Sequence, residues 1–100
     1  MINVNQNNAI TPSGTITVSL TKQGEANSTT EKWFYSINGG AFQENSSISG
    51  LIPSTGSINP GIAVANNISS IAVKVVEYKD NKEVKNGYTD ILTIYVNRDG

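Results

Sequence analysis

The segment that most constrains the fold is a short aromatic run that leads directly into a tight-turn signal. The only tryptophan of the chain, Trp33, lies within residues 32–37, where apolar residues recur at the period of a strand. Asn38 and Gly39 follow at once, and both tolerate the positive φ of a two-residue hairpin turn. We therefore expect a strand, a type I′ turn and a short return strand over residues 41–44. The residues expected on the core face of the first strand are Trp33, Tyr35 and Ile37.

Three further segments show the same alternation of apolar and polar residues, which is the pattern of a half-buried strand. These expected strands cover residues 14–22, 70–78 and 88–96. The residues that should face the core are Ile16, Val18 and Leu20 in the first, Ile71, Val73 and Val75 in the second, and Leu92, Ile94 and Val96 in the third.

The middle of the chain, residues 45–69, has a less regular pattern. Short apolar runs suggest one short strand within residues 46–53 and another over residues 62–64. Glycine and proline between them predict a loop over residues 54–60. Short, irregular strands of this kind fit the edge region of a sandwich.

About seven short strands at intervals of roughly 8–12 residues, separated by turn residues, are typical of an all-β sandwich. No window shows sustained helical spacing, and β-branched residues, which favour strands, are abundant. We therefore expect an immunoglobulin-like β-sandwich of about seven antiparallel strands. Residues 13–98 should form this domain, residues 1–12 a linker or an edge strand, and residues 99–100 the start of a C-terminal linker.

The composition argues against several classes of function. The chain has seven basic and eight acidic residues, and the basic residues are scattered, so a phosphate-binding face for nucleic acid or for an anionic membrane is not expected. It contains no cysteine and no histidine. Disulfides, structural zinc sites and nucleophilic triads depend on these residue types. We therefore expect no enzymatic activity, no cofactor and no metal, and folding in a reducing cytoplasm.

One turn contains several side chains with oxygen atoms that could bind calcium. Asp80, Asn81 and Glu83 lie in one expected turn, and oxygen atoms are the ligands that calcium prefers. Lysines at positions 79, 82 and 85 interleave these residues and would repel a divalent cation. The spacing also differs from that of an EF-hand loop, so we do not expect a calcium site here.

Exposed aromatic side chains could stack on sugar rings. The candidates for a binding site are Phe34, on the outer face of its strand, together with Tyr88 and Tyr95. The alternative for each is a structural role, in which the ring covers a sheet face or packs on a loop.

Two blocks of sequence carry a family resemblance. The first is Trp-Phe-Tyr-Ser-Ile-Asn-Gly-Gly over residues 33–40, and the second is Tyr-Thr-Asp-Ile-Leu-Thr-Ile-Tyr-Val over residues 88–96, followed by Asp99-Gly100. This pattern resembles the immunoglobulin-like modules of tail and tail-fibre proteins from phages and prophages of Gram-positive bacteria. Such modules commonly end at an Asp-Gly pair that leads into a linker or another module.

The resemblance implies a non-enzymatic structural or adhesion module of a virion tail, made in a bacterial cytoplasm. Its partners would be other domains or subunits of the tail or fibre assembly. It would act as a spacer or as a weak binder of host cell-surface polysaccharide. Two alternatives remain open: a repeat module of an adhesin on the bacterial cell surface, and an accessory carbohydrate-binding domain of a secreted glycosidase.

Overall fold

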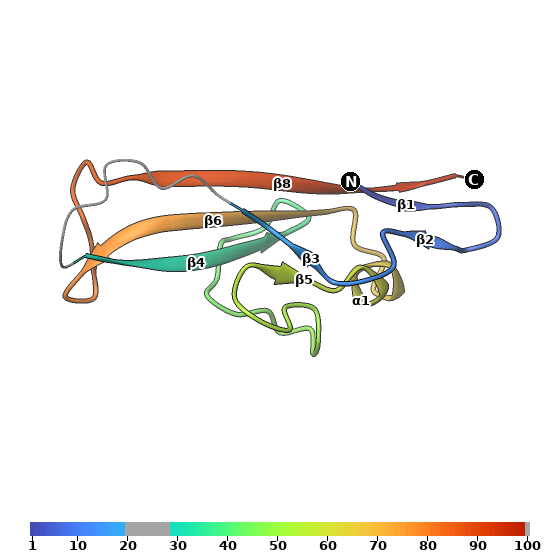
Figure 1. The fold of residues 1–100 in the computed structure, drawn as a ribbon, viewed down its shortest axis with the longest axis horizontal. Coiled ribbons are helices and arrows are strands. Elements are labelled where there is room, and N and C mark those ends of the chain that lie inside the picture. Colours follow the sequence, from blue (N-terminus) through green and yellow to red (C-terminus); the bar gives the residue numbers. More distant parts are fainter. Residues whose placement is uncertain (20–28, 100) are drawn as a thin grey trace.

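The computed structural model describes residues 1–19 and 29–99. In this part of the chain the expected all-β class is confirmed, with one short helix (Figure 1). The strands are β1 (Ile2–Val4), β2 (Ile10–Thr11), β3 (Ile16–Thr17), β4 (Thr30–Ile37), β5 (Ser57–Ile58), β6 (Ser70–Lys79), β7 (Lys82–Glu83) and β8 (Thr89–Arg98), and the helix is α1 (Pro60–Ala65). The molecule is elongated, with extents of 49 × 24 × 20 Å.

The larger sheet has the strand order β2-β1-β8-β6-β4, and β7 pairs with β6 at one end. β4 and β6 pair antiparallel over eight residues, from Thr30 opposite Tyr78 to Ile37 opposite Ile71. β8 pairs antiparallel with the other side of β6. β1 runs parallel to the end of β8, so the expectation of antiparallel pairing throughout is wrong for this pair. A parallel neighbour is possible here because β1 and β8 are joined through the rest of the domain rather than by a hairpin.

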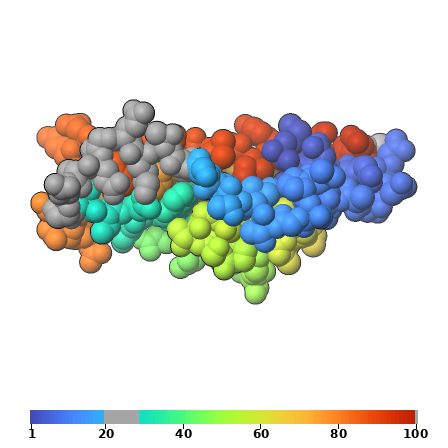
Figure 2. Space-filling view, viewed as in Figure 1, coloured from blue at the N-terminus to red at the C-terminus, as the bar shows by residue number. Residues whose placement is uncertain are grey.

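The smaller sheet consists of β3 and β5, paired antiparallel. It lies against one face of the larger sheet (Figure 1), and Figure 2 shows the segments of β3 and β5 side by side on that surface. Val18, just after β3, and Ile58 of β5 belong to the same buried cluster as Tyr35, Ile71 and Val73 of the larger sheet. The core is therefore the space between the two sheets.

The alternation in sequence predicts most of the core face correctly. Tyr35, Ile94 and the three aliphatic residues expected on β6 are buried, while Trp33, Ile37 and Val96 are half-buried against them. Leu92 is an exception, with 43% of its surface exposed. Among the described residues, β1 pairs only with residues 96–98 of β8. Leu92 therefore has no described neighbouring strand on that side of β8 and lies at the margin of the sheet. The expected strand 14–22 is described only in part, and Leu20 lies outside the described residues.

The middle of the chain differs most from expectation. Residues 62–64 lie in helix α1 instead of a strand. The Asn59 side chain accepts hydrogen bonds from the backbone N–H groups of Gly61 and Ile62, and Pro60 follows this N-cap with a φ already suited to a first helical turn. A strand, β5, lies within the expected loop 54–60, and none forms over residues 46–53.

The turn after β4 follows the prediction, whereas the return strand does not. Asn38 and Gly39 have φ values of 52° and 76°. The Asn38 side-chain oxygen accepts hydrogen bonds from the N–H groups of Ser69 and Ser70, which fixes the turn to the start of β6. The expected strand 41–44 is reduced to a single bridge between Gln43 and Tyr35.

The substitution Ile71→Ala should lower the free energy of unfolding by about 2–5 kcal/mol, because Ile71 is fully buried and its loss leaves a cavity. Ile91→Ala is the matched control, since Ile91 is 53% exposed and its substitution should change stability by less than about 0.5 kcal/mol. Urea denaturation followed by the fluorescence of Trp33 measures both. Equal losses in the two variants would contradict this assignment of the core.

Candidate functional site

Phe34 lies on the outer face of the larger sheet, within a small cluster of aromatic and basic side chains. Its ring is 6.1 Å from that of Tyr78, at a tilt of 38°. The Nζ atom of Lys74 lies 5.4 Å from the ring centre of Phe34 and 4.3 Å from that of Phe42. Phe34 is half-buried by these contacts, and its π face already has a cationic neighbour.

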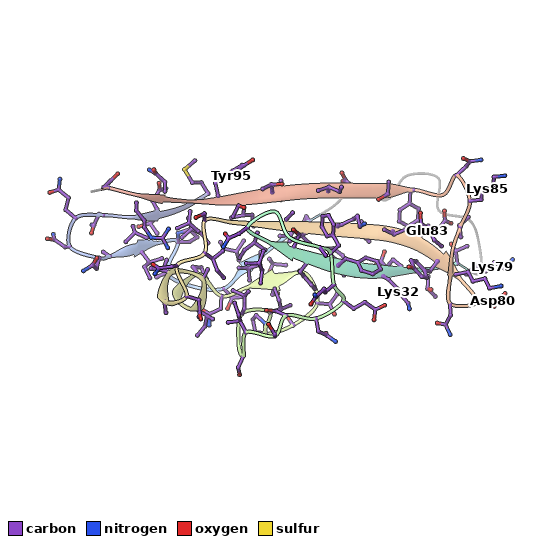
Figure 3. The ribbon with its side chains drawn as sticks, turned by 180° about the vertical axis from the view of Figure 1, so that it is seen from behind. Lys32, Lys79, Asp80, Glu83, Lys85 and Tyr95 are labelled. Atoms are coloured by element: carbon purple, nitrogen blue, oxygen red, sulfur yellow. The ribbon has the colours of Figure 1, made fainter. Side chains whose placement is uncertain are left out.

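Tyr95 lies on the same outer face but in a different place. Tyr95 is 59% exposed, and it lies opposite Ser70 of β6. Phe34 lies opposite Lys74 of β6, four residues further along that strand. Four residues separate the two levels, which is roughly 13 Å along a strand. Figure 3 shows Tyr95 far from the lysine-rich end of the molecule. One sugar ring could not contact both aromatic rings.

Tyr88 lies apart from both. Its hydroxyl is 3.5 Å from a carboxylate oxygen of Glu31, and its N–H donates to Glu77, whose side chain is buried. Glu31 and Glu77 share the core-facing side of the sheet with Trp33 by strand alternation. The three aromatic residues that the sequence singles out are therefore not brought together in one site.

The turn that contains Asp80 and Asn81 lies at the tip of the β6–β7 hairpin. Lys79 and Lys82 pair across the hairpin, and Asp80, Glu83 and Lys85 lie around them (Figure 3). Within residues 1–19 and 29–99, no group of three or more acidic side chains is placed so that it could hold a metal ion. In the same part of the chain, no helix has the length and apolar character to span a membrane.

A pocket lies along the edge of β4, between that strand and the loop that follows it. Its volume is about 460 Å³. The lining residues are Glu31, Lys32, Trp33, Tyr35, Glu44, Asn45, Ile52, Ser54 and Thr55. A smaller pocket of about 200 Å³ lies further along the same edge and shares Tyr35 and Asn45 with the first.

Trp33 lines this pocket, and its indole packs against Gly56. A Cβ atom added to Gly56 would lie 3.3 Å from the indole, so the loop backbone rests directly on the ring. The Gly56 N–H donates to the Tyr35 hydroxyl at 2.8 Å, and its carbonyl accepts from the N–H of Val18 at 2.8 Å. These two hydrogen bonds fix the Gly56 backbone against the indole, and Trp33 is half-buried.

Polar groups form the rim of the pocket. Lys32 and Glu44 make an ion pair of 3.2 Å, with 35% and 55% of their side chains exposed. Asn45, Ser54 and Thr55, whose side chains carry amide and hydroxyl groups, also line the pocket. An aromatic surface surrounded by amide, hydroxyl and charged groups suits a small polar ligand with one apolar face, such as a pyranose sugar.

Sequence reasoning placed Trp33 in the core and so missed the pocket that it lines. No periodicity marks this site, because the edge of β4 and residues 52–55 meet only through tertiary packing. The Glu44-Asn45 and Ser54-Thr55 pairs are polar, but in a chain rich in such residues they do not stand out.

No protein-family model, curated protein or solved structure matches this chain significantly. The site is therefore interpreted from its own geometry.

The substitution Gly56→Ala should destabilise the domain by about 1–3 kcal/mol, because Gly56 has a φ of 75° and its added methyl group would press on the Trp33 ring. The Trp33 emission spectrum should shift at the same time. Gly14→Ala is the matched control, since no atom lies within 4 Å of a Cβ at Gly14. Identical thermal unfolding and emission spectra for both variants would contradict the packing of Gly56 on the indole.

Proposed function

We propose that this chain is a non-enzymatic adhesion module of a phage or prophage tail protein, which binds carbohydrate of the host cell surface weakly through the pocket beside Trp33. The observation that carries the binding role is the combination of a half-buried tryptophan and several polar residues in the lining of one pocket. Weak binding at each site is sufficient where a particle presents many copies, because multivalency raises the overall avidity.

The strand arrangement supports an immunoglobulin-like sandwich as the fold of this module. In such a sandwich the second and fifth strands pair in one sheet, and the third, sixth and seventh strands form the other. Here β3 and β5 pair as the second and fifth strands do in such a sandwich. β4, β6 and β8 are adjacent in the larger sheet, as the third, sixth and seventh strands are. The elongated shape is compatible with a unit of an extended assembly, where it would also act as a spacer.

The test is a cell-binding assay with the domain coupled in many copies to fluorescent beads. We expect selective staining of some Gram-positive cells, lost when wall polysaccharide is stripped. Asn45→Ala combined with Thr55→Ala should reduce staining, because both residues are exposed and line the pocket. Tyr95→Ala is the matched control on the outer face and should stain like the parent.

Two results would contradict this proposal. Absence of staining by a folded domain would exclude the binding role and leave the spacer role. Loss of staining in Phe34→Ala, Tyr88→Ala or Tyr95→Ala, with the pocket variant unaffected, would move the site to the aromatic residues that the sequence singled out.

A further inference from the structure

Among the described residues, the edge of β4 that borders the pocket includes two backbone groups of Trp33 without a partner. In an antiparallel strand, successive residues direct their N–H and C=O groups to opposite sides. Asn38 donates to the carbonyl of Ser70 on the β6 side. Tyr35 exchanges two hydrogen bonds with Gln43 on the other side, at 2.7 and 2.9 Å. Trp33, two residues before Tyr35, must therefore direct both its N–H and its C=O toward the free edge.

Within the described part of the chain, nothing pairs with these two groups of Trp33. The segment after β4 pairs with that strand at one position only, where Gln43 lies opposite Tyr35. Residues 44 and 45 then form a bend that turns the chain away from β4. The pocket occupies the place that a continued strand would fill. A donor and an acceptor of Trp33 thus lie side by side at the edge of β4, and Trp33 is one of the residues that line the pocket.

We infer that this pocket recognises a pyranose through two adjacent ring hydroxyl groups, a vicinal diol, bound by the backbone N–H and C=O of Trp33. One hydroxyl would accept from the N–H and its neighbour would donate to the C=O, because a hydroxyl can do either. The diol would take the place of the facing residue in a sheet, which offers an acceptor and a donor side by side. This inference rests on the proposed carbohydrate-binding function and names the chemical group that is recognised.

The geometry favours a diol over an acetamido group or a peptide. The N–H and C=O of one trans amide point in opposite directions, so an acetamido group cannot pair with both groups of one residue. An added peptide strand would need a run of free edge positions. Here the Gln43 bridge closes the edge at Tyr35, and Lys32 and Glu44 are joined across the pocket rim at 3.2 Å.

The experiment is an NMR titration of the ¹⁵N-labelled domain with methyl β-glucopyranoside and with its tetra-O-methyl ether. Both sugars keep the ring and its apolar face, but only the first has free hydroxyl donors. We expect the backbone amide of Trp33 to shift with the free sugar. The ether should bind about tenfold more weakly, as expected for the loss of one or two hydrogen bonds. Trp33→Phe, which keeps the backbone pair, should retain this preference.

Several outcomes would overturn the inference, and they separate it from the proposed function. Equal binding of the sugar and its ether would mean that stacking alone holds the ligand. Chemical-shift changes confined to residues of the outer face would place sugar binding away from the edge of β4. A Trp33 amide signal that shifts with an extended peptide and with neither sugar would make the edge of β4 a peptide-binding site. Periodate cleaves the vicinal diols of the wall polysaccharide. If the beads still stain cells after this treatment, the proposed binding function is retained, but recognition of a vicinal diol is contradicted. Absence of binding to cells and to both sugars would remove both proposals.

Discussion

Strand β6 is hydrogen-bonded on both sides, and the rest of the fold depends on this double pairing. Its register with β4 and β8 brings Tyr35, Val73 and Ile94 to the same face, where they meet the side chains of β3, β5 and α1. With no cysteine to join the sheets, their cohesion comes from this buried apolar surface. Each register pair fixes its neighbours, because a slip of one residue would turn every core side chain to the opposite face.

The same arrangement leaves β4 at the margin of the sheet, and the candidate site follows from that position. A central strand would have its backbone groups paired by neighbours on both sides. At the margin, Trp33 packs one part of its surface on Gly56 and still borders a pocket. Trp33 therefore packs in the core through its side chain and directs its backbone N–H and C=O groups to the edge of the sheet. A small two-layer domain has few residues to cover its rim, so such dual roles are expected there.

The sequence predicted those features that depend on neighbouring residues. Alternation over Ile71, Val73 and Val75 marked β6 and its core face, and the Asn38-Gly39 pair marked a turn with two positive φ values. It did not predict helix α1, because six residues are too few for a helical period and the deciding feature was the Asn59 cap beside Pro60. The candidate site was missed for a different reason: the edge of β4 and residues 52–55 are distant in sequence and meet only through tertiary packing. The separation of Phe34, Tyr88 and Tyr95 depends on strand register, which the pattern of one strand does not give.

What the sequence determined by itself was the all-β class, the strand that contains Trp33 and the sharp turn after it. These follow from period-two hydrophobicity and from backbone preferences that act within a few residues. The tertiary structure alone decided that β1 runs parallel to β8, that Leu92 lies exposed at a sheet margin, and that the loop from Glu44 to Thr55 forms a pocket against β4. Each of these depends on contacts between segments far apart in the chain, and the sequence pattern of one segment carries no information about which other segment will cover it.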